Sequence, residues 1–217
     1  MKEFLVNKIF VQNNLYNMET ETTQMNKINE LLPIRVHVGI GCQGTVMSKT
    51  CASLMGILIT SHDKITGYSM RQGGDIVSAR TFCVQDAIEK KATHILFIDS
   101  DMNFPADTLE RLLAHDKDIT TVEYNRRQLP LSPIVAPLEE KSETELYKAR
   151  VIGGGCLLIK LSVFDKIAKP WFVFGRGKDG MVTMGEDSWF SHQARDVGID
   201  SWIDPTIKVG HIGEFLY

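Results

Sequence analysis

The sequence predicts an α/β fold in which a mainly parallel sheet is flanked by helices. From residue 33 onward, short apolar runs of strand length alternate with amphipathic stretches, a pattern typical of strand–helix repetition. Residues 94–98 read HILFI and are almost entirely apolar, as expected for a central parallel strand covered on both faces. A chain of 217 residues is long enough for one large domain of this class.

The individual elements follow from strand, helix and turn signals. Gly73 and Gly74 form a turn that leads into a helix, and Pro105 suits the first turn of the next one. Gly198 is a natural residue to follow the last helix. The expected strands are residues 34–40, 64–70, 94–98, 118–124, 151–160, 200–204 and 206–210. The expected helices are residues 47–60, 76–91, 105–115, 161–168 and 185–198.

Two segments fall outside this alternation. Residues 1–32 are rich in Asn, Thr, Glu and Met and have no regular period, so we expect an N-terminal appendage before a single domain over residues 33–217. Residues 125–148 carry three prolines and many charges. We therefore expect them to form a long excursion over the surface.

The composition excludes several classes of protein. With 24 Lys+Arg against 27 Asp+Glu and a formal charge of −3, the chain lacks the basic stripe of a general nucleic-acid binder. No window approaches the ~18 consecutive apolar residues that span a bilayer. The start of the chain has no signal-peptide pattern, so a cytoplasmic location is expected. The four cysteines are scattered without a C-x-x-C pair and are expected to be reduced thiols.

A pair of acids follows the central apolar run. Asp99 and Asp101 stand one residue apart, at the carboxyl end of a strand, which is where ligands bind in open α/β sheets. Two such carboxylates can share Mg²⁺ or Mn²⁺, hard cations that prefer oxygen ligands and leave room for phosphate. The alternative is that these residues only form the turn before the Pro105 helix.

A second acidic pair and one histidine complete a possible site. Glu186 and Asp187 stand at the start of the last expected helix, where an acid is either a helix cap or a general base. His211 lies between two glycines after a short strand, and a neutral imidazole is a common metal ligand. Two acidic clusters and a histidine, each at the end of an element, indicate a site with a metal and a base.

The Gly-Gly turn is flanked by residues suited to a phosphate-rich ligand. Arg71 precedes it, Asp75 stands at the expected cap of a helix, and Arg80 lies on that helix. These residues would bind ribose, base or phosphate, or else belong to a capped surface helix. The glycines at 153–155 are not followed by the Lys and Ser/Thr of a P-loop, and no G-x-G-x-x-G follows the first strand. A P-loop protein and a dinucleotide-binding protein with the Rossmann glycine motif are therefore excluded.

The order of these motifs resembles that of a known family. The chain reads GGDIVSAR, THILFIDSDMNFPADTLERLLAHDKDI, YNRR, VIGGGCLLIK and finally GEDSWFSHQARDVGIDSWIDPTIKVGHIG. This series is similar to the nucleotide-sugar glycosyltransferases of the GT-A fold, in the family-2-like group of phages and bacteria. The resemblance covers residues 34–213. It implies a single Rossmann-like domain that moves a sugar from a nucleoside-diphosphate sugar to an acceptor hydroxyl.

The resemblance also implies roles for the site residues. Asp99 and Asp101 look like the D-x-D motif, with Asp101 as a metal ligand and Asp99 near the donor or the metal. His211 resembles the histidine that completes coordination of Mn²⁺ or Mg²⁺. Glu186 and Asp187 match the family's E-D motif, and Asp187 is the preferred general base of an inverting enzyme.

The match has two departures from the family pattern. Arg80 matches a family arginine, but Thr81 stands where asparagine is usual. The first strand also lacks the common P-x-[YF]-N ending, since residues 39–44 read GIGCQG. These departures leave the contacts to the base and ribose of the donor open.

Three other functions compete with this interpretation. A haloacid-dehalogenase-like phosphatase would need Thr where Asn103 stands, and a nucleotidyltransferase would need a basic loop within residues 39–47. A non-catalytic module that binds carbohydrate or nucleotide sugar on the same fold remains open. Metal-dependent hydrolysis of a donor would separate that module from an enzyme.

Overall fold

A computed structural model describes residues 33–42, 44–72 and 74–213 of the chain. The expected appendage of residues 1–32 lies outside the described residues. All elements described below belong to one compact unit that begins at Arg35. The described part of the chain contains no helix that is long and apolar enough to cross a membrane.

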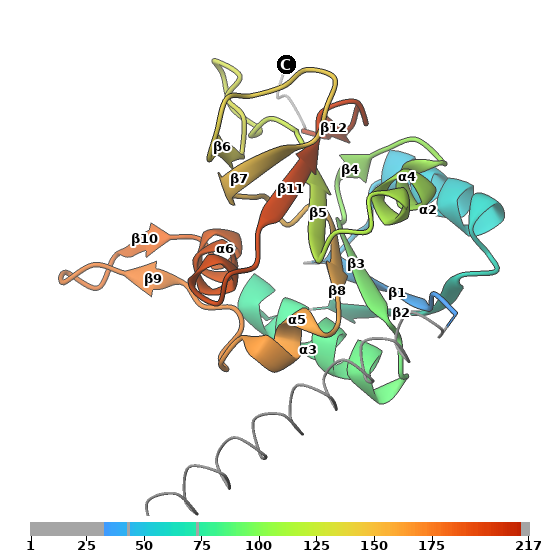
Figure 1. The fold of residues 1–217 in the computed structure, drawn as a ribbon, viewed down its shortest axis with the longest axis horizontal. Helices are drawn as coiled ribbons and strands as arrows, with labels where there is room; N and C mark the ends of the chain where they lie inside the picture. Colours follow the sequence, from blue (N-terminus) through green and yellow to red (C-terminus); the bar gives the residue numbers. More distant parts are fainter. Residues whose placement is uncertain (1–32, 43, 73, 214–217) are drawn as a thin grey trace, which may run out of the picture. The chain divides into compact units, whose positions relative to one another are not determined.

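The centre of the unit is a sheet with the strand order β2-β1-β3-β8-β5-β11-β7-β6 (Figure 1). Its strands are β1 (Val36–Cys42), β2 (Ile65–Gln72), β3 (His94–Asp99), β5 (Ile119–Val122), β6 (Ala136–Pro137), β7 (Tyr147–Val151), β8 (Cys156–Lys160) and β11 (Ser201–Asp204). Strands β2, β1 and β3 pair in parallel, as do β5 and β11. Strand β8 lies antiparallel between β3 and β5, and β7 pairs antiparallel with β11. The predicted α/β fold with a mainly parallel sheet is thus confirmed, with two strands reversed.

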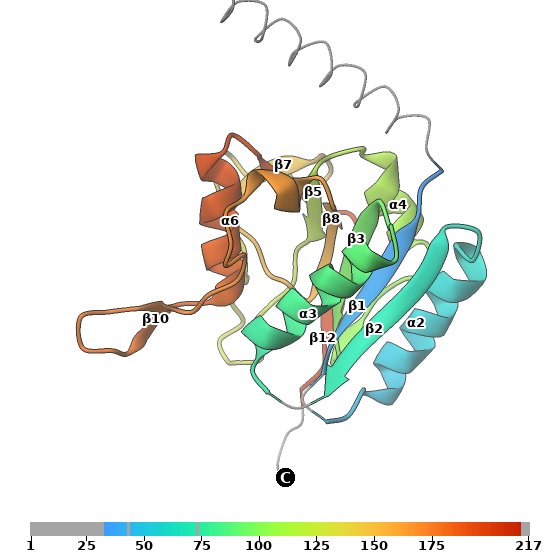
Figure 2. The ribbon, with the colours of Figure 1, turned by 90° about the horizontal axis from the view of Figure 1, so that it is seen from below.

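Helices cover both faces of this sheet, as Figure 2 shows for α3 and α2. The helices are α2 (Ser48–Thr60), α3 (Ile76–Glu89), α4 (Thr108–Ala114), α5 (Val163–Lys166) and α6 (Glu186–Asp196). One core packs side chains of α3, α5 and α6 against the sheet, and a second packs α2 and α4 against the other face. Strand β3 supplies both, since Ile95 and Phe97 belong to the first core and Leu96 and Ile98 to the second. This two-sided burial explains its lack of polar alternation.

The structure differs from the sequence prediction in several short elements. The end of the predicted 125–148 excursion belongs to the sheet, because Tyr147 and Ala149 are buried while the residues between and after them face outward. That alternation was hidden by the surrounding charges. The predicted 206–210 strand is instead β12 (Gly210–His211), which pairs with β4 (Met102–Asn103). A hairpin of β9 (Gly175–Arg176) and β10 (Val182–Met184) was not predicted, and it projects away from the sheet in Figure 1.

The reversed strand has a consequence for one edge of the sheet. The carboxyl ends of β1, β3 and β5 meet there, because these strands run in the same direction. Since β8 runs the opposite way, its amino end lies at this edge too, preceded by Gly153–Gly155. The three glycines therefore lie among the strand ends that carry Asp99 and Tyr124.

Candidate functional site

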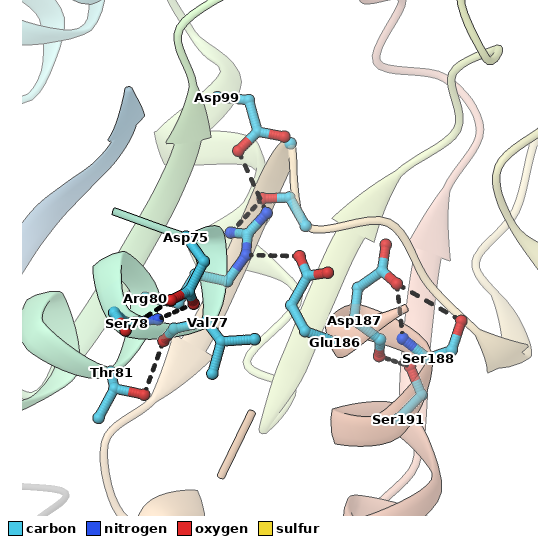
Figure 3. A network of polar contacts seen from close by, with 12 residues as sticks. Asp75, Val77, Ser78, Arg80, Thr81, Asp99, Glu186, Asp187, Ser188 and Ser191 are labelled. Carbon is cyan, nitrogen blue, oxygen red and sulfur yellow. Dashed lines mark hydrogen bonds and ion pairs between the residues drawn. The ribbon is translucent and has the colours of Figure 1, made fainter. Parts of the chain in front are cut away.

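Arg80 is the centre of the polar network at this edge (Figure 3). Its side chain comes from α3 and is only 4% exposed. Nη2 donates to Asp99 Oδ1 at 3.1 Å, Nε donates to Glu186 Oε1 at 3.1 Å, and Nη1 donates to the Gly154 carbonyl at 3.0 Å. Burial alone would lower the pKa of Arg80, but Asp99 and Glu186 outweigh it and raise that pKa. The arginine is thus a buried, permanent cation that joins the two predicted acidic clusters.

The glycines before β8 make room for this network. A Cβ atom at Gly154 would fall on the guanidinium of Arg80, and one at Gly153 would fall on the hydroxyl of Tyr124. A Cβ at Gly155 would lie 2.7 Å from the same hydroxyl, to which the Gly155 N–H donates at 2.7 Å. The structure shows that the three glycines allow Arg80 and Tyr124 to approach the backbone.

Asp101 and His211 are brought together by the short β4–β12 ribbon. His211 pairs with Met102 across this ribbon, and the Ile212 N–H donates to the Asp101 carbonyl at 2.8 Å. The side chains follow: His211 Nε2 lies 3.4 Å from Asp101 Oδ1. His211 Nδ1 lies 3.0 Å from the Asn125 carbonyl. A carbonyl can only accept, so Nδ1 carries the proton and Nε2 points toward Asp101.

This arrangement fits one half of a divalent-metal site. Metal-binding histidines usually donate their second ring nitrogen to a carbonyl or carboxylate, which fixes the ring, and the Asn125 carbonyl does so here. Asp101 adds an oxygen ligand, and phosphate or water can supply the rest. Among residues 33–42, 44–72 and 74–213, no three His, Cys, Asp or Glu side chains are grouped to hold a metal. Asp99 does not belong to the Asp101–His211 pair, because its Oδ1 accepts a hydrogen bond from Arg80.

Asp101 and His211 line two cavities. The smaller has a volume of about 490 Å³, and the larger has a volume of about 1030 Å³. Residues that line both are Thr45, Ser100, Asp101, Arg127 and His211. Asp99 and Asp75 line only the smaller one. The strand ends therefore surround a polar hollow with the Asp101–His211 pair in its wall.

The remaining predicted residues take different positions. Asp75 caps α3 by accepting from the Ser78 N–H at 2.8 Å, and its hydrogen bonds from Ser78 lower its pKa. Arg71 lies over the ring of Phe82, 5.5 Å from its centroid. It lines neither cavity. Asp75 thus lines the smaller cavity with Asp99 and Asp101, whereas Arg71 packs on Phe82.

The two acids of α6 differ in environment. Glu186 is buried and paired with Arg80, whereas Asp187 is partly exposed and accepts from its neighbour's N–H, Ser188, at 2.6 Å (Figure 3). Burial and the adjacent Glu186 raise the pKa of Asp187, with Arg80 opposing them. Asp187 lines neither cavity. It lies beside the network while Glu186 forms part of it.

Several residues of this site had no assigned role in the sequence. Tyr124 lies in edge contact with the His211 ring, with centroids 5.5 Å apart, and Arg127 Nη1 lies 2.8 Å from Asp101 Oδ2. Both follow the carboxyl end of β5, and that position was their signal. By contrast, Trp171 and Phe172, aromatic residues suited to a sugar face, are buried in the first core.

The fold is the GT-A fold of glycosyltransferases, which comparison with solved structures supports. The crystal structure titled A197 from STIV superposes with a TM-score of 0.62 at 18% identity, over 83% of this chain and 87% of that one. The structure of GalNAc-T7 with UDP, GalNAc and Mn²⁺ gives a TM-score of 0.53 at 14% identity over 83% of this chain. This chain spans 44% of the GalNAc-T7 chain.

Comparison of sequences adds nothing to this result. No protein-family profile matches the chain, and no curated protein matches it by sequence. At identities of 14% and 18%, the two structural likenesses establish the fold alone.

Proposed function

We propose that the protein is a metal-dependent glycosyltransferase of the family-2-like, phage and bacterial type. It would move a hexose from a nucleoside-diphosphate sugar to an acceptor hydroxyl with inversion at the anomeric carbon. The observation that carries the proposal is the Asp101–His211 pair, with His211 Nδ1 held by a carbonyl and Nε2 3.4 Å from the carboxylate. This pair lies in the wall of the cavity that Asp99 and Asp75 also line.

The donor would occupy the smaller cavity. Its volume of about 490 Å³ lies within the ordinary range for small-molecule sites. Gly41, Gly44 and Asp75 all line it, and the two glycines allow the backbone to approach a base and ribose closely there. Arg80 pairs with Asp99 and neutralises its charge. This pairing lowers the repulsion between the Asp99 carboxylate and a diphosphate.

Asp101 and His211 would hold Mn²⁺ or Mg²⁺. A divalent cation there supplies Lewis-acid stabilisation of the negative charge that grows on the departing nucleoside diphosphate. The likeness to a solved structure that contains UDP, GalNAc and Mn²⁺ supports a nucleotide sugar and a divalent cation as the ligands. The protein's own part is to present one carboxylate and one imidazole whose Nδ1 is held by the Asn125 carbonyl.

Asp187 is the proposed general base. An acceptor hydroxyl must lose its proton as it attacks, and a carboxylate with a raised pKa is a stronger proton acceptor than an ordinary one. Glu186 is bonded to Arg80, so its proposed role is to hold Arg80 and the start of α6 in place. Of the two predicted catalytic acids, the contacts thus favour Asp187 for proton transfer.

The test is a binding and turnover screen with a matched control. UDP-, GDP-, CDP- and ADP-sugars are added with and without Mn²⁺, and both the thermal shift and the released nucleotide are measured. We expect one nucleotide to stabilise the protein and to be released, with Mn²⁺ required for both. Asp101→Asn should abolish both effects, whereas Asp107→Asn, the same change at an exposed position, should leave them intact. An Asp101→Asn variant that behaves like wild type would refute the proposal.

A non-catalytic nucleotide-sugar or carbohydrate-binding module is the second candidate. The observation that favours it is that Asp187 lines neither cavity. The same screen separates the two functions. A module would be stabilised by a nucleotide sugar through Asp101 without releasing nucleotide in the presence of any acceptor or of water.

A further inference from the structure

Arg127 lines both of the cavities described above. Its Nη1 is 2.8 Å from Asp101 Oδ2, while the other oxygen, Oδ1, faces His211 Nε2 at 3.4 Å. The two oxygens of Asp101 therefore face two different partners. Arg127 thus pairs with one oxygen of Asp101, the carboxylate that we propose as a metal ligand.

The backbone around Arg127 is well fixed, in contrast to its side chain. The Arg126 N–H donates to the Ser132 carbonyl at 2.9 Å, and the Ile134 N–H donates to the Tyr124 carbonyl at 3.0 Å. The Arg127 side chain is 54% exposed. Within the described part of the chain, the Asp101 pair is the one polar contact that its guanidinium makes. The guanidinium can therefore change partner while the loop stays in place.

Electrostatics favours such a change when ligands bind. A divalent cation between Asp101 and His211 would repel the guanidinium, because both are positive and close together. A half-exposed ion pair is weak and is readily exchanged for a stronger one. The planar guanidinium also matches phosphate oxygens in a two-pronged geometry, and its charge is independent of pH. A diphosphate beside Asp101 would offer it that stronger partner.

We propose that Arg127 is a displaceable cation that exchanges the Asp101 carboxylate for the phosphate oxygens of the donor. In the free protein it neutralises Asp101 and so competes with the metal. In the loaded protein it faces the leaving diphosphate from the side of the larger cavity. This inference rests on the proposed function, because it assumes the Asp101–His211 metal site.

The proposal predicts opposite changes in two affinities. The affinity for Mn²⁺ alone is measured by calorimetry, followed by the affinity for inorganic pyrophosphate at saturating Mn²⁺. Arg127→Ala should bind Mn²⁺ about 3- to 10-fold more tightly, because the competing cation is gone. It should bind pyrophosphate about 10-fold or more weakly, because a charge-assisted ligand is gone. Arg127→Lys keeps the positive charge but loses the paired N–H donors of the guanidinium. It should therefore restore the wild-type Mn²⁺ affinity and only part of the pyrophosphate affinity.

The matched control is Arg150→Ala. Arg150 is an exposed arginine on β7 that lines neither cavity, so its loss changes the net charge equally and should change neither affinity by more than about 2-fold. Unchanged or weaker Mn²⁺ binding by Arg127→Ala would overturn the inference, because the loss of a merely structural residue would weaken the binding of both Mn²⁺ and pyrophosphate. If Asp101→Asn binds Mn²⁺ like wild type, the metal site itself fails, and the proposed function fails with it. If Asp101→Asn loses Mn²⁺ and Arg127→Ala gains no affinity, only the role of Arg127 fails.

Discussion

Arg80 and Glu186 stand 106 positions apart in the chain and meet in a buried ion pair of 3.1 Å. The pair joins α3 to the first residue of α6, so the helix that presents Asp187 is tied to the helix beneath the smaller cavity. Asp99 and the Gly154 carbonyl accept the remaining bonds of the same guanidinium. One side chain thus links α3 to the end of β3, the turn before β8 and the start of α6.

Removing this cation should destabilise the fold more than removing one of its partners. Arg80→Gln would leave the buried Glu186 and the partly buried Asp99 without a counter-charge, and we expect a loss of about 3–5 kcal/mol in the free energy of unfolding. Glu186→Gln keeps a hydrogen-bond acceptor and should cost about 1–2 kcal/mol. Urea unfolding followed by circular dichroism measures both. An equal cost for the two variants would contradict the central role of Arg80.

The close approach at Gly154 gives a second prediction. Gly154→Ala would place a methyl group on the Arg80 guanidinium, and moving that buried group should cost roughly 1–3 kcal/mol of stability. Gly44→Ala is the control, because a Cβ there meets no atom within 4 Å. Its stability should stay within about 0.5 kcal/mol of wild type. If the two variants unfold at the same urea concentration, the packing argument is wrong.

The partly buried His94 should make the stability of the fold depend on pH in the acidic range. Burial, reinforced by Lys160, lowers the pKa of His94 to about 4. Because the folded pKa lies below the ordinary value of 6.5, the stability that His94 contributes is fully present above pH 6.5 and is lost as the pH falls to about 4. This loss should amount to roughly 1–3 kcal/mol.

The comparison of variants isolates this contribution. Denaturant unfolding is measured from pH 7 to pH 4 for wild type and His94→Gln. The stability of the variant should fall less steeply across that window, whereas His62→Gln, at an exposed histidine, should follow wild type. Parallel curves for wild type and His94→Gln would show that His94 is not the group responsible.

Asp204 fixes the segment that leads to His211. It pairs with His115 Nε2 at 2.8 Å and accepts from the Thr206 N–H at 2.7 Å. Asp204→Asn should loosen this segment, so that the Ile212 amide exchanges its hydrogen faster and Mn²⁺ binds several-fold more weakly. Hydrogen exchange and calorimetry check the two effects.

A surface variant controls for the change of charge. Asp200→Asn removes a half-exposed acid whose partner is Lys148, and it should leave the exchange of the Ile212 amide unchanged. If Asp204→Asn also leaves that amide protected, the contacts of Asp204 with His115 and Thr206 do not position His211.

The sequence predicts the main elements because both faces of the sheet are covered. Buried strands such as His94–Asp99 lose polar alternation, and turns with glycine or proline mark most element boundaries. Strand β7 escapes this logic, since it is a short alternating strand within a charged segment. The β4–β12 ribbon escapes it as well, because two-residue strands have no period to detect.

The candidate site divides along a similar line. Asp99 and Asp101 could be placed because the end of a parallel strand is a known location for ligands. Which of Glu186 and Asp187 meets Arg80 could not be predicted, because adjacent helical residues point about 100° apart and the packing of α6 decides between them. The position of Arg71 could not be predicted either, because its spacing from the Gly-Gly turn does not reveal that it lies over Phe82.

The reversal of β8 changes the electrical character of this edge. In a wholly parallel α/β sheet, a helix usually follows each strand, and the helix N-terminus brings partial positive charge to the ligand edge. Here the turn before β8 directs the Gly154 carbonyl into the same region, which is a partial negative charge in its place. The buried guanidinium of Arg80 therefore serves as an internal counter-ion for this carbonyl as well as for the carboxylates of Asp99 and Glu186.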